Sequence, residues 1–247
     1  MSDFFITCAS NLYTSDFPNN TPWYFITPLP KPLELDKEKW ECGLAEISFP
    51  NSWHNLPTNE LQIKVLKNNN IILNDNVEGG LYTVQEFITY LNQWLHVKLH
   101  GKKIEFMLQE NALRLRIVID THYEIQMTPI LSKKLGFQGV THLNSTRLSS
   151  EPVDLDLNNA YMFVYSNLIE ESYVGNSYVK LLRPVTIKTK TPHQYTINTY
   201  DSPHYRKLAT SFENSIEISL STIEGKPFKL NSGVVIVTLH FRKLNNA

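Results

Sequence analysis

A long succession of short apolar segments with a period of two residues is the feature that most constrains this chain. Apolar and polar residues alternate along residues 61–65 and again along residues 216–220. Side chains on successive residues of a strand point to opposite faces, so this pattern predicts a mainly β protein. From residue 160 onward, strands are predicted over residues 161–165, 178–182, 185–188, 194–200, 215–220 and 234–241. The chain has only 9 glycines, which disfavours nucleotide-binding folds built on glycine-rich loops.

A strand is expected over residues 40–49, with a bulge inside it. Trp40 and Leu44 hold one apolar phase, whereas Ile47 holds the other. A change of phase within one strand indicates an extra residue near Ala45–Glu46. We expect Trp40 to anchor the core at the start of this strand.

A pair of strands joined by a turn and a central strand are also predicted. The Asn68–Asn70 run predicts a turn between a strand over residues 61–65 and its partner over residues 71–73, because Asn tolerates left-handed conformations. Residues 234–241 are apolar on both phases. This segment is therefore expected to be a central strand that is covered on both faces.

Residues 79–143 follow a different pattern and predict a small α+β subdomain. Thr83 and Glu86 form a capping box, and apolar residues then recur with helical spacing up to Leu95. Strands are expected next over residues 104–108, 113–119 and 123–127, followed by a helical turn over residues 132–135 that ends at a glycine. The helix is the strongest helical signal in the chain.

The rest of the chain predicts a jelly-roll β-sandwich into which this α+β subdomain is inserted. We expect residues 36–78 and 144–247 to form the sandwich. Residues 1–35 contain scattered aromatic side chains and five prolines without a helical period, which predicts an extended N-terminal arm. Residues 144–153 are polar and linker-like.

Composition narrows the class of protein. Lys and Arg total 23, Asp and Glu total 24, and the net charge is −1, so no nucleic-acid partner is expected. The longest apolar runs are too short for a membrane span. The first residues lack the basic flank and apolar stretch of a signal peptide, so the protein is expected to be made inside a host cell. Two cysteines cannot form a disulfide framework.

Catalytic and metal-binding patterns are weak. Cys42 and His54 are the residue types of a cysteine protease, but Cys42 lies on the apolar phase of a strand, as a core cysteine would. His96 and His100 have a chelating spacing without a third ligand. Asp154 and Asp156 alternate with leucines, which fits an edge strand or, with more oxygen ligands, a calcium site. We expect no enzymatic activity, no cofactor and no metal.

Several segments, taken in order, resemble a known family. They are WECGLAEISFP (Trp40–Pro50) with Ser52-Trp53, LSKKLGF (Leu131–Phe137), NLIE (Asn167–Glu170) with Val174-Gly175, LLRPV (Leu181–Val185), PHY (Pro203–Tyr205), IEI (Ile216–Ile218), GKPF (Gly225–Phe228) and VTLHFR (Val237–Arg242). Together they are similar to the minor capsid (penton) proteins of Maverick/Polinton elements and adintoviruses. The resemblance extends from about residue 4 to residue 242.

This resemblance implies a single-jelly-roll structural protein of the virion. Such a protein forms homopentamers at icosahedral vertices and contacts a double-jelly-roll major capsid protein there. Aromatic residues of the arm and of two turns are the candidate subunit contacts: Phe4, Phe5, Tyr13, Trp23, Tyr24, Trp53, His204 and Tyr205. Two alternatives remain open, a jelly-roll carbohydrate-binding module and a cysteine protease.

Overall fold

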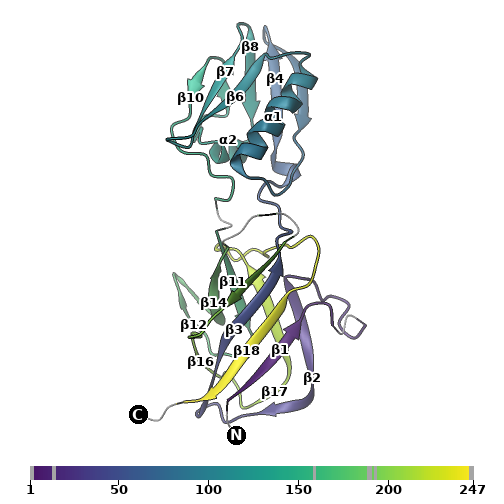
Figure 1. The fold of residues 1–247 in the computed structure, drawn as a ribbon, viewed down its shortest axis with the longest axis vertical. Coiled ribbons are helices and arrows are strands. Elements are labelled where there is room, and N and C mark those ends of the chain that lie inside the picture. The colour runs from purple at the N-terminus through teal and green to yellow at the C-terminus, as the bar shows by residue number, and fades with distance from the viewer. Residues whose placement is uncertain (1–2, 13–14, 158–159, 188–190, 192–193, 245–247) are drawn as a thin grey trace. The chain divides into compact units, whose positions relative to one another are not determined.

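A computed structural model describes residues 3–12, 15–157, 160–187, 191 and 194–244. The chain divides into two compact units (Figure 1). Residues 1–53 together with 158–247 form one unit, called the sandwich unit below, and residues 54–157 form the other, called the α+β unit. The chain thus leaves the sandwich once and returns to it once.

The sandwich unit consists of antiparallel strands in two main sheets. The first sheet has the order β1-β18-β3-β15, with β16 also paired to β3, and the second has the order β14-β11-β17-β2. The strands of the first sheet are β1 (Phe4–Ala9), β3 (Trp40–Pro50), β15 (Tyr195–Thr199), β16 (Arg206–Lys207) and β18 (Ile236–Lys243). Those of the second are β2 (Tyr24–Glu34), β11 (Tyr161–Ser166), β14 (Leu181–Thr186) and β17 (Phe212–Ser221). A hairpin of β12 (Ser172–Val174) and β13 (Ser177–Val179) adds a small third sheet.

Alternation along the strands produces the core between the two sheets (Figure 1). Leu239 and Phe241 of β18 are buried, whereas the residues between and beside them are at least partly exposed. On β17, Ile218 and Leu220 are buried in the same alternating way. The bulge predicted in β3 is confirmed, because the β18 register shifts between Thr238 and Leu239.

Strand β18 is central as predicted, since it lies between β1 and β3. It is covered on one face only, however, because Thr238, His240 and Arg242 are half-exposed on the other face. Trp40 is buried and lies 5.6 Å, centroid to centroid, from the Phe4 ring. Its expected place in the core is therefore confirmed.

The N-terminal segment differs from the extended arm expected over residues 1–35. Phe4–Ala9 pairs in register with β18, and Tyr24–Glu34 pairs with β17. Both segments are therefore strands of the sandwich itself. The absence of a helical period does not exclude strands, because an aromatic and proline-containing segment can satisfy its backbone groups by pairing with strands distant in sequence.

The α+β unit contains two sheets and two α-helices. One sheet has the order β5-β4-β8-β9 and the other has the order β10-β7-β6. The elements are η1 (Thr58–Glu60), β4 (Gln62–Lys67), β5 (Asn70–Asn76), α1 (Val84–Lys98), β6 (Ile104–Gln109), β7 (Arg114–Ile119), β8 (Tyr123–Met127), α2 (Pro129–Lys134), β9 (His142–Leu143) and β10 (Arg147–Leu148). The predicted helix, strands and helical turn are confirmed with small shifts at their ends. The turn between β4 and β5 has positive φ at Asn68 and Asn69, as expected.

Helix α1 is fixed at its start and along its side. Thr83 accepts a hydrogen bond from the Glu86 backbone N–H, and Glu86 accepts one from the Thr83 backbone N–H, so the capping box is present. The Asn92 side chain bonds both to the backbone N–H and to the carbonyl of Phe106, each at 2.8 Å. The helix thereby satisfies backbone groups of β6, which lies at an edge of its sheet.

The boundaries of the two units differ from those expected from sequence. The hairpin β4–β5 belongs to the α+β unit, because β4 also pairs with β8. The linker-like residues 144–153 belong there too, since Arg147 and Leu148 pair with β7 and Val153 is buried in its core. Polarity alone could not reveal these pairings, because it reports exposed side chains and not the backbone partner.

Asp154 and Asp156 lie in a turn and not in the edge strand considered above. The Asp154 carboxylate accepts hydrogen bonds from the backbone N–H groups of Asp156 and Leu157, each at 3.0 Å. Next to this turn the ammonium group of the buried Lys134 donates to the Leu155 carbonyl. Burial lowers the pKa of Lys134, and the carboxylates of Asp156, Asp154 and Glu60 oppose that shift.

Candidate interface on the first sheet

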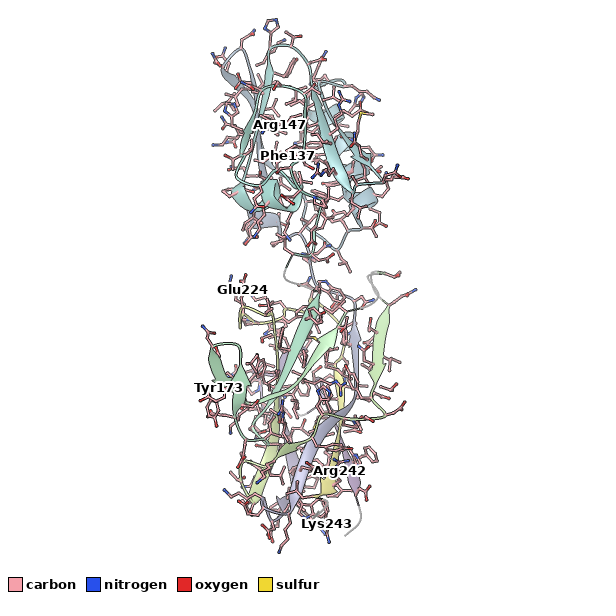
Figure 2. The ribbon with its side chains drawn as sticks, turned by 90° about the vertical axis from the view of Figure 1, so that its left-hand side faces the viewer. Phe137, Arg147, Tyr173, Glu224, Arg242 and Lys243 are labelled. Carbon is pink, nitrogen blue, oxygen red and sulfur yellow. The ribbon has the colours of Figure 1, made fainter. Side chains whose placement is uncertain are left out.

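The outward face of the first sheet carries a cluster of aromatic and charged side chains. It is formed by Phe5, Glu41, Tyr205, His240 and Arg242 and is called the Phe5 cluster below. β1, β3 and β18 supply four of these residues in neighbouring register positions. Figure 2 shows Arg242 next to Lys243 at the end of β18.

The members of the Phe5 cluster hold one another in place. Phe5 stacks on the His240 ring at 4.4 Å between centroids, with an angle of 13°. The Tyr205 hydroxyl and His240 Nδ1 are 2.7 Å apart, which is a hydrogen-bond distance. The Arg242 guanidinium lies 3.4 Å above the Tyr205 ring centre, and its Nε donates to Glu41 Oε1 at 2.6 Å. The arrangement combines stacking, cation–π and ion-pair contacts.

Gly43 makes room for this arrangement. It pairs with His240 in the sheet register, directly beneath the loop that carries Tyr205. A Cβ atom at Gly43 would lie 2.9 Å from Pro203 Cβ and 3.2 Å from Tyr205 Cδ1. The glycine is therefore needed for close approach of the loop to the strand.

Phe5 is the most exposed member, with 62% of its surface accessible. A large apolar ring that is held by stacking yet remains exposed is typical of a contact surface, because burying it costs little conformational entropy. His204, next to Tyr205, is also exposed. The pKa of His204 is lowered by the Arg183 guanidinium, by desolvation and by Arg206. His204 is thus held closer to its neutral form.

The structure distributes the sequence-predicted contact residues over several places. Phe5 and Tyr205 both contact His240 on the outward face, and His204 is the exposed neighbour of Tyr205 in sequence. Phe4 stacks on Phe241 at 4.9 Å on the opposite face of β1 and β18. Tyr24 is the first residue of β2 in the second sheet, and Trp23 lies in the turn just before it. Tyr13 lies outside the described residues.

Trp53 does not offer an exposed ring for a subunit contact. It is only 2% exposed and packs against Phe49 and Phe228, at 6.3 and 5.7 Å between ring centroids. A turn after a proline indicated a surface position, but long-range aromatic packing buries the side chain.

Sequence reasoning missed Glu41, His240 and Arg242. The available signal was the alternation of polar His240 and Arg242 with apolar Leu239 and Phe241. The segment's high apolar content concealed that alternation. Partner residues distant in sequence, such as Phe5 and Tyr205, could be recognised only after pairing was known.

The candidate catalytic cysteine lies in the protein core. Cys42 is fully buried, and burial followed by the neighbouring Cys8 raises the pKa of its thiol, which disfavours the reactive thiolate. His54 belongs to the α+β unit. Among the described residues, no three His, Cys, Asp or Glu side chains form a group that could hold a metal ion. No helix in the described ranges is long and apolar enough to cross a membrane.

The two antiparallel sheets form a jelly-roll β-sandwich. Among solved structures, the fold is similar to that of the mavirus penton protein, with a TM-score of 0.55 and 11% identity over 99% of this chain and 100% of that chain. A chain of the Sputnik virophage cryo-EM structure aligns with a TM-score of 0.49 and 12% identity over 98% of each chain. No protein-family model matches the sequence. A search of curated proteins finds no match.

Proposed function

We propose that the protein is a structural protein of a virion, a penton-type minor capsid protein. It forms homopentamers at icosahedral vertices and contacts a double-jelly-roll major capsid protein. One observation carries this proposal: the fold matches the mavirus penton protein over the full length of that chain. The buried state of Cys42 favours this role over that of a cysteine protease.

Ring assembly requires two different surfaces on each subunit, because a cyclic oligomer closes by head-to-tail contacts. The Phe5 cluster is the first. The second is a group of exposed apolar side chains farther along the same face, Tyr195, Ile197 and Ile236, called the Ile197 group. Ile236 and Ile197 both pair with Ser48 and so lie in one row across the sheet, and Tyr195 lies two residues from Ile197 on the same face of β15.

The Ile197 group has the properties of a contact surface. Ile197 is 63% exposed on β15, an edge strand of the first sheet. Exposed edge strands and exposed apolar side chains both favour association. We propose that the Phe5 cluster of one subunit packs against the Ile197 group of the next. A stable ring would bury about 800 Å² per partner at each contact.

The two units have separate roles in this proposal. The sandwich unit carries both contact surfaces and builds the ring. The α+β unit, residues 54–157, is an insertion in the jelly roll with its own core of buried apolar residues. Assembly into the ring therefore depends on side chains of the sandwich unit.

Light scattering on the purified full chain tests the pentamer. We expect a mass of five copies of the 28.6 kDa chain. Phe5→Ser and Ile197→Ser should each shift the protein toward monomer, because each removes an exposed apolar contact without opening the core. Tyr173→Ser is the matched control, because Tyr173 is 83% exposed on the β12–β13 hairpin and belongs to neither surface.

Co-expression with the major capsid protein of the same element tests the partner. The wild-type chain should co-purify with the major capsid protein and with assembled particles. A chain that stays monomeric at high concentration and binds no major capsid protein would contradict the proposed function. A pentamer that is unaffected by both Phe5→Ser and Ile197→Ser would contradict only the assigned surfaces.

A further inference from the structure

The outward face of the second sheet contains a pocket that the capsid role does not require. Its volume is about 400 Å³, and it lies where β2 begins and β17 ends. The loop after β17, marked by Glu224 in Figure 2, borders this end of the sheet. The lining residues are Asn19, Thr21, Trp23, Tyr24, Ser219, Leu220, Ser221, Gly225 and Pro227. We propose that this pocket binds an uncharged saccharide.

Aromatic rings flank hydroxyl groups on this face. Ser219 pairs with Tyr24 on one side and with Tyr165 on the other, so the three residues form a row on the outward face. In the next row, Ser221 pairs with Phe163. A sugar ring has an apolar C–H face and a polar hydroxyl rim, and it fits a site with aromatic rings beside hydroxyl groups.

Polar groups in the pocket are available to a ligand. Within the described residues, the Asn19 amide and the Ser219 hydroxyl have no hydrogen-bond partner. The Tyr24 phenol already hydrogen-bonds to the Glu217 carboxylate, and burial, followed by that carboxylate, raises the pKa of Tyr24. The Asn19 amide and the Ser219 hydroxyl supply both donors and acceptors, as saccharide hydroxyls require.

Charge argues for a neutral ligand. None of the lining residues is ionised at neutral pH. In the bordering loop, Lys226 and Glu224 pair with each other at 2.8 Å. The nearby Glu217 carboxylate would repel an anionic sugar such as a sialylated glycan. A pocket of this volume lies within the ordinary range of about 300–1,000 Å³ for small ligands.

The pocket also predicts binding without a metal. Calcium-dependent sugar recognition needs several carboxylate or carbonyl oxygens around the ion. The pocket lining contains no Asp or Glu side chain. Binding should therefore be unchanged by EDTA.

A glycan array probed with the full-length protein tests the inference. The array should carry neutral glycans ending in glucose, galactose, mannose or N-acetylglucosamine, together with sialylated and sulfated ones. We expect binding to at least one neutral class. Ser219→Phe fills the centre of the aromatic row and should weaken binding by about tenfold or more. Trp23→Ala should weaken it in the same way.

The controls separate loss of the site from loss of the fold. Ser219 is half-exposed on the outward face, so Ser219→Phe leaves the buried face of β17 unchanged. Tyr173→Ala removes an exposed ring on the β12–β13 hairpin (Figure 2) and should bind as the wild type does. Asn19→Ala replaces an exposed side chain and tests the pocket if Trp23→Ala fails to fold.

Four outcomes would overturn the inference. They are no binding to any neutral glycan, binding to acidic glycans alone, loss of binding in EDTA, and full binding by folded Ser219→Phe. Each result is independent of oligomeric mass. The inference can therefore fail while the capsid role stands, and the capsid role can fail while glycan binding is observed.

Discussion

The two units differ in how far along the chain their strand partners lie. In the sandwich unit, Phe4 pairs with Phe241 and Trp40 pairs with Lys243. In the α+β unit, β4 pairs with β5 and β6 pairs with β7 across short turns. Pairing over long sequence distances requires costly loop closure before the contacts form. The α+β unit can therefore fold from local information, whereas the sandwich needs both ends of the chain.

The units also differ in whether a helix covers an edge strand. In the α+β unit, helix α1 packs beside β6, and Asn92 bonds to its backbone. In the sandwich unit, the first sheet presents the exposed Phe5 and Ile197 side chains on its outward face. The α+β unit also has exposed apolar side chains on its edge strand β5, at Ile71 and Ile72. The difference between the units therefore concerns how β6 is covered, and the assignment of the interfaces to the sandwich unit belongs to the proposal above.

Removing β1 should have the largest effect, and it should affect the sandwich unit alone. Deletion of residues 1–10 takes away the strand that covers one edge of β18, together with the buried Cys8. We expect the sandwich unit to lose its cooperative unfolding transition entirely. The α+β unit should keep its transition, because its strands pair only within residues 54–157.

Circular dichroism during denaturant unfolding measures both transitions. Residues 54–157 expressed alone supply the control and should unfold at the same denaturant concentration as in the deletion variant. If the isolated fragment is unfolded, the inference that the α+β unit folds without the sandwich unit is wrong. If the deletion leaves both transitions intact, β1 is dispensable for the sandwich.

Core truncations should separate the unfolding transitions of the two units. Trp40→Ala opens a cavity beside Phe4 and should cost the sandwich unit about 3–5 kcal/mol. Phe87→Ala, at a fully buried position of α1, should cost the α+β unit a similar amount. Each variant should shift one denaturant midpoint only. A single midpoint that moves in both variants would show that the units unfold together.

Local signals predicted the α+β unit far better than the sandwich. The capping box of Thr83 and Glu86 specified the start of α1, and Asn68–Asn70 specified the β4–β5 turn. These features act within a few residues. The N-terminal strands could not be found in this way, because β1 is stabilised by a partner more than two hundred residues away, as the Phe4 and Phe241 register shows.

The candidate interface was predictable only in part. Aromatic content indicated Phe5 and Tyr205 as contact residues, since exposed aromatic rings mark interfaces. Adjacent residues of a strand point to opposite faces, so only one of Phe4 and Phe5 can face the core. The sequence did not indicate which one, because the pairing of β1 with β18 decides which face is buried. The partners His240 and Arg242 required the fold, which brings the ends of the chain together.

Gly43→Ala tests the close approach that builds the Phe5 cluster. The added Cβ would lie 2.9 Å from Pro203 Cβ, so the loop carrying Tyr205 must move. Such overpacking should cost about 1–3 kcal/mol, confined to the transition of the sandwich unit. Ser48→Ala on the same sheet is the control and should have almost no effect. An unchanged midpoint in Gly43→Ala would mean that the loop does not rest on β3.

The smallest expected effect concerns the cap of helix α1 and tests whether local signals stabilise the α+β unit. Thr83→Ala removes the side chain that accepts from the Glu86 backbone N–H, and it should cost that unit about 1 kcal/mol.

Hydrogen bonds from the Thr83 backbone N–H and hydroxyl lower the pKa of Glu86. A carboxyl whose pKa is lower in the folded state stabilises the fold above its ordinary, unfolded pKa. This contribution disappears as the pH falls through the lower, folded value. The α+β unit should therefore lose stability on acidification, and Glu86→Gln, which cannot ionise, should reduce that slope. An equal slope in Glu86→Gln, measured by denaturant midpoints from neutral to acidic pH, would exclude the capping carboxylate as a source of the acid sensitivity.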